Sequence, residues 1–288
     1  MTKYNLKKIE DTIFSLIVNT SSSLPDDVFK ALEKAYKKED KKSIAALQLK
    51  LMLKNAKIAR SKKRPLCQDT GTLFFIIESA NFATAKTIIE PAILTAVQKA
   101  TSEAFLRANT ISSLTGKPCS NISEISPQIE FKINPALKRN SVTLLMKGGG
   151  SENIGSQYSL PDEDLNAERD INGIKKVIID SVINAQGKAC PPGAIGVCIG
   201  GDRASGYYHA KKLFLRKIGE RNKTPQIASL EIEMLKKINS LGIGPQGLGG
   251  KTFALELFIT FLPRHPASFF VTISHMCWAW RRGKIFFD

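Results

Sequence analysis

The sequence lacks the features of secreted and membrane proteins. Among its 288 residues, no run approaches the roughly 18 consecutive apolar residues that a membrane span needs. The first six residues, MTKYNL, hold no apolar core followed by a small-residue cleavage site, so no secretory signal is predicted. We therefore expect a cytoplasmic protein without membrane attachment. The hydrophobic content of 43% is enough for a sizeable core.

Cysteine is scarce and irregularly spaced. The five cysteines are Cys67, Cys119, Cys190, Cys198 and Cys277. An odd number in a large chain without an export signal argues against a disulfide framework. The absence of a CxxC pair excludes zinc-ribbon and ferredoxin-like motifs, but widely separated cysteines can still hold a cluster. Metal ligation, nucleophilic catalysis and plain burial remain open for these thiols.

Acidic residues are few compared with basic ones. The chain has 26 Asp and Glu against 42 Lys and Arg, a net charge of +16, and much of the excess lies before residue 65. Nucleic-acid binding is one interpretation, and a solvated helical surface is another. Aromatic residues do not interleave with the lysines as a single-strand stacking surface requires, which favours the solvated surface. A third interpretation is a positive potential that attracts an anionic substrate.

Helical periodicity dominates the N-terminal part of the chain. Ile9, Ile13 and Leu16 recur at helical spacing. The segment Leu24-Pro25-Asp26-Asp27 is typical of a helix start, with acids in the first turn, and a helical pattern resumes over residues 44–59. We predict an N-terminal helical layer over residues 1–65.

A mixed pattern follows over residues 66–288. Short apolar runs predict strands near 72–78, 128–133, 142–146, 194–199, 253–261 and 268–274. Longer segments predict helices near 84–107, 162–186, 204–216 and 226–239. With no internal repeat and no disordered linker, the sequence indicates one α+β domain over residues 1–288. Its helical layer is expected to pack on a mixed sheet with surrounding helices.

Reactive side chains are concentrated in Cys67-Gln68-Asp69-Thr70-Gly71. A thiol, an amide, a carboxylate and a hydroxyl occupy consecutive positions before a glycine, and a predicted strand follows directly. Polar residues on a loop that leads into a rigid strand are well placed for chemistry. A surface turn beside a buried structural cysteine is the alternative.

Three further loops are rich in glycine or proline. They are KGGGSEN at 147–153, ACPPG at 189–193 and LGIGPQGLGG at 241–250. Glycines let backbone N–H groups approach an anion closely, although each loop could also be an ordinary turn. A nucleotide P-loop is not indicated, because Pro245 stands where the first glycine before Gly250-Lys251-Thr252 is required. A last polar segment, Arg264-His265-Pro266-Ala267-Ser268, precedes a predicted strand that leads to Cys277.

Together these segments resemble the iron–sulfur hydro-lyases of the class I fumarase and tartrate dehydratase family. The resemblance extends from Leu24 to Arg282. It rests on five motifs in the same order, namely Cys67–Gly71, Lys147–Asn153, Ala189–Pro192, Gly242–Gly247 and Arg264–Ser268. In this family three cysteines hold a 4Fe-4S cluster whose fourth iron has no protein ligand and binds substrate.

The resemblance implies a role for each cysteine. Cys67, Cys190 and Cys277 stand at the family's ligand positions, and thiolates suit iron–sulfur clusters. Cys198 lies in an apolar run and is expected to serve packing, and Cys119 is expected to be an incidental loop thiol. An iron with an open position would act as a Lewis acid on the substrate.

The resemblance also implies the residues that handle the substrate. Asp69 and His265 correspond to an acid–base pair at the leaving hydroxyl, a sensible proton-transfer unit near neutral pH. Gln68 and Asp69 are expected to contact the substrate. Arg107, forty residues after Cys67, is expected to hold a carboxylate in bidentate fashion.

Backbone amides are expected to complete this binding site. By the same resemblance, the N–H groups of Gly149 and Gly150 would bind another carboxylate oxygen. The substrates of the family are dianions, which would give the positive net charge a use.

A partner chain is expected as well. Single-chain members of the family continue into a second domain that supplies a threonine base and further arginine and lysine contacts, whereas this sequence stops soon after Cys277. We therefore predict the α subunit of an α2β2 or similar enzyme. The motif at 147–153 favours hydration of fumarate to L-malate, and an L(+)-tartrate dehydratase α subunit that yields oxaloacetate is the alternative. Asp69, Arg107 and His265 argue against a non-catalytic relative.

Overall fold

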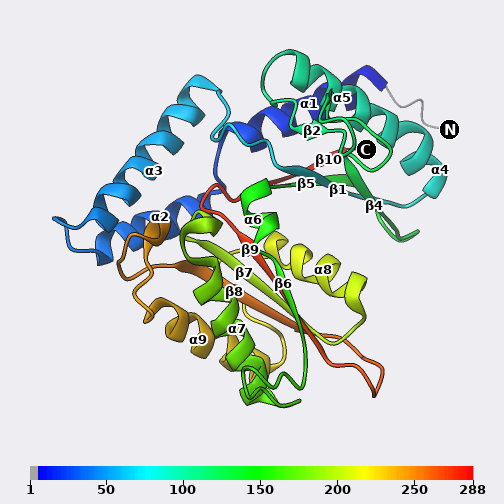
Figure 1. The fold of residues 1–288 in the computed structure, drawn as a ribbon. Helices are drawn as coiled ribbons and strands as arrows, with labels where there is room; N and C mark the ends of the chain where they lie inside the picture. Colours follow the sequence, from blue (N-terminus) through cyan, green and yellow to red (C-terminus); the bar gives the residue numbers. More distant parts are fainter. Residues whose placement is uncertain (1–5, 288) are drawn as a thin grey trace. The chain divides into compact units, whose positions relative to one another are not determined.

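The chain folds into two compact units. A computed structural model describes residues 6–287 (Figure 1). The first unit combines residues 1–25, 54–149 and 281–288, and the second combines 26–53 and 150–280. The predicted helical layer over 1–65 therefore contributes residues to both units. The predicted α+β class is confirmed.

The first unit is built on a four-stranded mixed sheet. Its strands are β1 (Thr72–Ser79), β4 (Gln128–Ile133), β5 (Asn140–Lys147) and β10 (Arg281–Phe287), in the order β10-β5-β1-β4. Strand β1 runs parallel to β4 and antiparallel to β5, and β10 pairs antiparallel with β5. The last strand of the chain thus returns to the sheet that the Cys67 loop enters.

Helices α1 (Leu6–Ser22) and α5 (Glu90–Ser102) cover this sheet and share one apolar core with it. The buried side of α1 contains the predicted periodic positions Ile9, Ile13 and Leu16. The short α4 (Phe82–Thr84) and a π-helical turn (Ala85–Ile89) lead into α5. The helical region predicted over 84–107 therefore ends five residues early.

Three shorter or bridging elements complete this part of the chain. Helix α3 (Ile44–Lys62) continues from the second unit into the first, and α6 (Gly149–Asn153) begins at the next change of unit. Strands β2 (Thr110–Ile111) and β3 (Pro118–Cys119) form a small antiparallel pair. Of the helices in residues 6–287, none combines the length and the apolar character needed to cross a membrane.

The second unit has its own four-stranded mixed sheet. Its strands are β6 (Ser156–Ser159), β7 (Gly193–Ile199), β8 (Ala254–Phe261) and β9 (Phe270–Met276), in the order β6-β9-β7-β8. Strands β7 and β8 are parallel, and β9 is antiparallel to both of its neighbours. The predicted strands near 194–199, 253–261 and 268–274 are confirmed with small shifts, whereas the polar β6 was not predicted.

Helices pack on both faces of this second sheet (Figure 1). On one face, α7 (Ile171–Ala185) and α9 (Pro225–Asn239) share an apolar core with the odd-numbered residues of β7. On the other face, α8 (Arg203–Lys212) approaches so closely that a Cβ on Gly196 would lie 2.4 Å from the Ala210 carbonyl oxygen. Helix α2 (Asp26–Lys38) also contacts this unit at β8. The helix predicted from residue 162 begins at 171.

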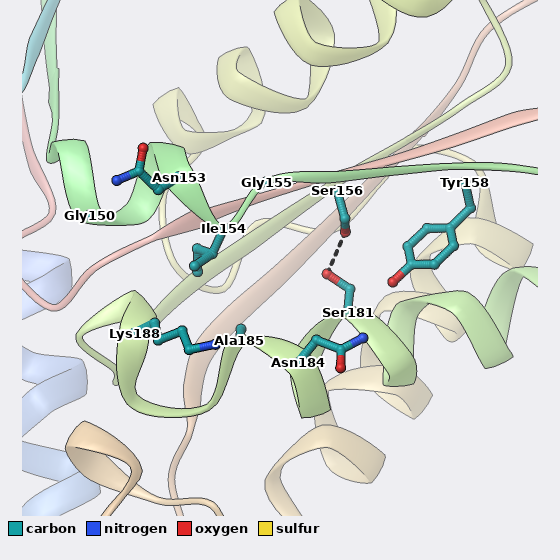
Figure 2. A pocket seen from close by; sticks show the side chains of 10 residues that line it. All are labelled: Gly150, Asn153, Ile154, Gly155, Ser156, Tyr158, Ser181, Asn184, Ala185 and Lys188. Atoms are coloured by element: carbon teal, nitrogen blue, oxygen red, sulfur yellow. Dashed lines mark hydrogen bonds between the residues drawn. The ribbon is translucent and has the colours of Figure 1, made fainter.

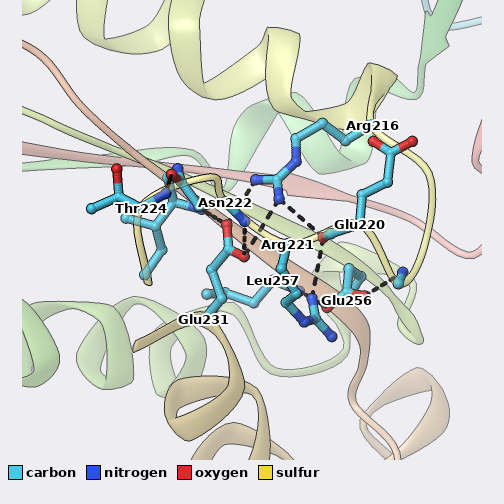
Figure 3. A network of polar contacts seen from close by, with 10 residues as sticks. Arg216, Glu220, Arg221, Asn222, Thr224, Glu231, Glu256 and Leu257 are labelled. Carbon is cyan, nitrogen blue, oxygen red and sulfur yellow. Dashed lines mark hydrogen bonds and ion pairs between the residues drawn. The ribbon is translucent and has the colours of Figure 1, made fainter. Parts of the chain in front are cut away.

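Two buried carboxylates hold the segment between α8 and α9 in place (Figure 3). The Arg216 guanidinium donates to Glu231 over 2.7 Å, and Arg221 donates to Glu256 over the same distance. The Gly219 N–H donates to the other oxygen of Glu256. The Asn222 N–H donates to the other oxygen of Glu231. Both carboxylates are almost completely buried, so their stability in the core depends on these donors.

Candidate active site

The Cys67–Gly71 loop is fixed by its close approach to the end of β5. Gly71 has a φ of +73°, and a Cβ there would lie 2.2 Å from the Lys147 carbonyl oxygen. Only glycine meets both demands without displacing the backbone. The residue that closes the motif is therefore required by the pairing of β1 with β5.

The Asp69 carboxylate accepts three hydrogen bonds within the first unit. Its Oδ1 accepts from the Gly71 N–H at 2.7 Å and from the Asn109 side-chain amide at 3.0 Å. Its Oδ2 accepts from the Gly149 N–H at 2.7 Å. The donors come from three separate segments, so the orientation of this carboxylate is determined by the fold.

The backbone of Asp69 is held from a fourth direction. The guanidinium of Arg281, on β10, donates to the Asp69 carbonyl oxygen over 2.9 Å, and Arg281 is 1% exposed. A buried guanidinium has a rigid set of donors, which suits it to this positioning role. The resemblance of the segment after Cys277 includes Arg281, but its contact with Asp69, 212 residues earlier, was not predicted.

Arg107 is tied to the same loop through its backbone. The Thr70 hydroxyl donates to the Arg107 carbonyl oxygen over 3.0 Å and accepts from the Arg107 N–H over 2.7 Å. The side chain of Thr70 is buried, while Arg107 and Gln68 are exposed. The first unit thus brings four predicted substrate residues together by main-chain and carboxylate contacts, namely Gln68, Asp69, Arg107 and Gly149.

Gly149 and Gly150 are not required by crowding or by backbone conformation. A Cβ on Gly149 would meet Asp69 Oδ2 at 3.8 Å, and one on Gly150 would meet the Lys188 carbonyl oxygen at 3.7 Å, both ordinary contact distances. Neither is among the glycines with positive φ. The lack of a side chain leaves the Gly150 N–H approachable, whereas the Gly149 N–H already donates to Asp69 Oδ2.

In the second unit, the loops of Cys190 and Cys277 are joined directly. The Trp278 N–H donates to the Cys190 carbonyl oxygen over 3.0 Å. A Cβ on Gly193 would lie 1.7 Å from the Met276 carbonyl oxygen, so the ends of β7 and β9 meet closely here. Cys190 itself adopts a left-handed conformation, with φ 49° and ψ 55°. These two predicted ligands therefore lie on neighbouring, mutually supported loops.

The glycine-rich loop before β8 supports the Cys190 loop. Both the backbone N–H and the side-chain amide of Gln246 donate to the Pro191 carbonyl oxygen, each over 2.9 Å. A Cβ on Gly187 would lie 2.4 Å from the Gln246 carbonyl oxygen. The predicted motif around Gly242–Gly247 thus acts as a backbone support for a cysteine loop, without a phosphate-binding geometry.

The five cysteines differ in accessibility, but Cys119 is half-buried like two of the predicted ligands. Cys190 is exposed, and Cys67 and Cys277 are half-buried. Cys198 is completely buried in β7, and burial raises the pKa of its thiol to about 12. A thiol that resists ionisation is a poor metal ligand or nucleophile. Cys119 lies on β3, away from the three predicted ligand loops in sequence.

The predicted ligands are divided between the units. Cys67 belongs to the first unit, and Cys190 and Cys277 belong to the second. Among residues 6–287, no three side chains of His, Cys, Asp or Glu form a metal-binding group. The donor set nevertheless has suitable chemistry, since accessible thiols on loops braced by backbone hydrogen bonds can ligate iron.

His265 lies away from the two cysteine loops of its own unit. It occupies the loop before β9, while Cys277 follows the last residue of β9. Seven extended residues separate the two ends by roughly 23 Å. His265 Nδ1 accepts from the Ala267 N–H over 3.2 Å, which organises a local turn. The structure therefore does not bring His265 next to Cys190 or Cys277.

A cavity of about 540 Å³ lies within the second unit, and Gly150 and Lys188 are among the residues that line it (Figure 2). On its wall the Ser156 hydroxyl donates to Ser181 Oγ over 2.7 Å, and Ser181 Oγ lies 3.1 Å from His275 Nε2. None of the three predicted cysteine ligands lines this cavity.

Comparisons with known proteins concern nearly the whole chain. The family model described as fumarate hydratase (Fumerase) matches residues 10–286. A Geobacillus stearothermophilus protein provisionally named as a class I fumarate hydratase is 38% identical over 287 residues, which are 98% of this chain and 55% of that protein. This chain thus spans about half the length of that relative.

Two further relatives are named as single subunits. A Methanocaldococcus jannaschii protein, provisionally named L(+)-tartrate dehydratase subunit alpha, is 41% identical over 281 residues, which are 96% of each chain. The L(+)-tartrate dehydratase subunit alpha of Escherichia coli is 30% identical over 285 residues, which are 97% of this chain and 91% of that one.

Proposed function

Because this chain belongs to the fumarate hydratase family, we propose that it is the α subunit of an iron–sulfur hydro-lyase that interconverts fumarate and L-malate. The family predicted from the sequence motifs is confirmed. The proposal for the reaction rests chiefly on one observation. An Asp69 carboxylate oriented by three N–H donors stands two residues from a predicted cluster ligand, Cys67.

We assign the cluster to Cys67, Cys190 and Cys277. Their thiols are accessible, and the loops that carry them are braced by the Gly71, Trp278 and Gln246 contacts described above. When bound, such a cluster supplies a Lewis-acidic iron with an open position that polarises the substrate hydroxyl. The remaining chemistry falls to side chains of this protein and of its partner.

Asp69 is proposed to manage the proton of the leaving group. In the direction of dehydration, a protonated Asp69 gives its proton to the hydroxyl, which leaves as water while the carboxylate is regenerated. In hydration the same oxygen takes a proton back from the attacking water. A rigidly oriented carboxyl group favours this transfer because little conformational entropy is lost when it reaches the reactive geometry.

Gly150, Arg107 and Gln68 are proposed to bind the dicarboxylate, whereas the hydrogen bond of the Gly149 N–H to Asp69 gives no support to the contact predicted between that N–H and the substrate. The Gly149 N–H is already committed to Asp69 Oδ2, so it connects the acid to the anion-binding segment. The exposed Arg107 guanidinium can form a bidentate pair with a carboxylate. The net charge of +16 would favour encounter with a dianion.

His265 remains a predicted member of the acid–base pair on the basis of the family resemblance alone. Its position at the far end of β9 from Cys277 gives that role no geometric support within the second unit. Substituting His265 by Gln and measuring kcat decides whether it takes part in catalysis.

A β subunit is proposed as the partner. Two relatives that match this chain over more than nine-tenths of their own length are both named as alpha subunits, which implies a second chain. In the family pattern that chain supplies the base and additional carboxylate contacts. An α2β2 assembly is the stoichiometry we propose.

The decisive experiment is an anaerobic assay of the chain co-expressed with its β subunit. We expect hydration of fumarate and dehydration of L-malate, together with the broad visible absorption of a thiolate-bound cluster. Preferential turnover of L-tartrate to oxaloacetate would instead establish the second candidate, which the names of two relatives favour. No activity on any of the three compounds would overturn the proposed function.

Cysteine variants test the ligand assignment separately. Cys67→Ser, Cys190→Ser and Cys277→Ser should each abolish the cluster absorption. Cys119→Ser is the matched control and should retain it, because Cys119 lies on β3 outside the three loops. Equal behaviour of all four variants would show that the assignment is wrong.

A further inference from the structure

We propose that Asn109 is a positioning residue that fixes the orientation of the Asp69 carboxylate and leaves one of its two oxygens available to the reacting group. This inference deepens the proposed function and rests on it. Asn109 lies outside every motif that pointed to the family, and it follows Asp69 by 40 residues. Its side-chain amide donates to Asp69 Oδ1 over 3.0 Å.

The three donors divide unequally between the two oxygens of Asp69. Oδ1 accepts from the Gly71 N–H and the Asn109 amide, and Oδ2 accepts only from the Gly149 N–H. A carboxylate oxygen has two lone pairs in the plane of the group. Within residues 6–287, Oδ1 is therefore fully used, whereas Oδ2 keeps one acceptor position. The structure assigns Oδ2 as the oxygen that remains available to the reacting group.

Asn109 is the donor that creates this difference. Without its amide, each oxygen would accept one backbone N–H, and the carboxyl group would lose its preference. The other two donors are backbone groups, so Asn109 is the contact that a side-chain substitution removes without altering the chain path.

A buried amide holds Asn109 in place. Asn121 is 2% exposed, and its Oδ1 accepts from the Asn109 backbone N–H over 3.0 Å and from the Thr110 hydroxyl over 3.3 Å. Its Nδ2 donates to the Arg107 carbonyl oxygen over 2.9 Å and to the Thr101 hydroxyl over 3.1 Å. All four bonding positions of this amide are used.

The same amide therefore orders the proposed acid and the proposed carboxylate-binding arginine. Asn121 contacts Arg107 directly and reaches Asp69 through Asn109. Its φ of +59° suits asparagine, which adopts left-handed conformations more readily than most residues. This anchoring explains how an exposed loop presents the Asn109 amide at a fixed point, as a catalytic contact requires.

The test compares Asn109 variants in the co-expressed, anaerobically prepared enzyme with fumarate and L-malate as substrates. Asn109→Leu removes the donor at similar size, and Asn109→Gln keeps an amide on a longer stem. We expect Asn109→Leu to lower kcat by about 10- to 100-fold with KM changed less than about 3-fold, as is usual for lost supporting hydrogen bonds. Asn109→Gln should recover part of the loss.

A matched control separates positioning from general damage. Asn55 also donates its side-chain amide near the motif, to the Leu66 carbonyl oxygen at 3.0 Å, but does not reach Asp69. Asn55→Leu should leave kcat within about 3-fold of the wild type. Cluster absorption and far-ultraviolet circular dichroism should match the wild type in both leucine variants, so that the change in kcat reports the lost hydrogen bond to Asp69.

Two outcomes overturn different statements. If Asp69→Asn is inactive while Asn109→Leu keeps kcat within about 2-fold, the proposed function survives and Asn109 is not a positioning residue. If Asp69→Asn retains wild-type activity, the role proposed for Asp69 is wrong, and the inference about Asn109, which depends on that role, is wrong as well. Should Asn109→Leu fail to fold, Asn109→Asp provides the test. It is isosteric and places a second carboxylate beside Asp69, so it must lower kcat at least as much as the glutamine variant does.

Discussion

Replacing Gly71 by alanine should damage both the first sheet and the active-site loop. An alanine there would occupy a φ of +73° and place its Cβ 2.2 Å from the Lys147 carbonyl oxygen. Contact of a Cβ with such an oxygen normally begins near 3.4 Å. Either β1 or β5 must therefore move where Thr72 pairs with Lys147.

The magnitude follows from two separate costs. A left-handed conformation costs a non-glycine residue roughly 1–2 kcal/mol, part of which is offset by the smaller entropy of the unfolded chain. Overpacking against a fixed backbone adds about 1–3 kcal/mol. Gly116 isolates the first cost, because its φ is +68° and a Cβ at that position would have no neighbour within 4 Å.

The assay is native-state hydrogen exchange at the amides of β1, with kcat measured on the same samples. We expect Gly71→Ala to lower the opening free energy by roughly 1–3 kcal/mol more than Gly116→Ala does. Activity should fall in Gly71→Ala alone, since the Gly71 N–H donates to Asp69. If the opening free energies of the two variants agree within about 0.5 kcal/mol, the close approach to Lys147 is not the reason why position 71 requires glycine.

Three other substitutions test separate features. Gly150→Ala should fold like the wild type but raise KM for the dicarboxylate, because a Cβ there has ordinary room yet covers the amide. Glu231→Gln should cost about 3–5 kcal/mol in urea unfolding followed by tryptophan fluorescence, while Glu233→Gln, on the same helix but half-exposed, should cost less than about 1 kcal/mol. A hydrogen bond from Lys284 holds the pKa of Glu78 below its ordinary value. Its stabilisation is thus present above that ordinary value and lost as pH falls through the lowered one, so Glu78→Gln should flatten the acid limb of stability against pH.

The strands that could be predicted are those buried on both faces, because complete burial requires an almost continuous run of apolar residues. β1 and β7 are apolar on both faces, and each was recognised within one residue of its bounds. β6 and β10 were missed because their sequences, SQYS and RRGKIFF, lack such a run, and their positions depend on neighbours distant in the chain.

The first residue of a helix was difficult to predict for a similar reason. The pattern over 162–186 contained an amphipathic helix, but Asp170 accepts from the Gly173 N–H and begins it at residue 171. A cap depends on which carboxylate actually meets the terminal amides, and a single sequence does not specify that choice.

The same distinction applies to the site. Asp69 was predicted from the family resemblance and Gly71 from the local motif, but nothing in the sequence around Asn109, Asn121 or Arg281 predicted the contacts that these three residues make. Each is brought to Asp69 or Arg107 by the pairing of elements far apart in sequence. Residues that position a catalytic group are recognised from hydrogen bonds, which exist only after the sheet has formed.

His265 shows why sequence separation is an unreliable measure of distance. Twelve positions separate it from Cys277, a spacing that a single loop could close. Seven of those positions form β9, and an extended strand moves the chain by about 3.3 Å per residue. The antiparallel pairing of Ile199 with Val271 and of Ala194 with Met276 keeps that strand straight from one end of the sheet to the other. The secondary structure between two residues, rather than their number, therefore decides whether they can share one site, and His265→Gln should leave the cluster absorption unchanged.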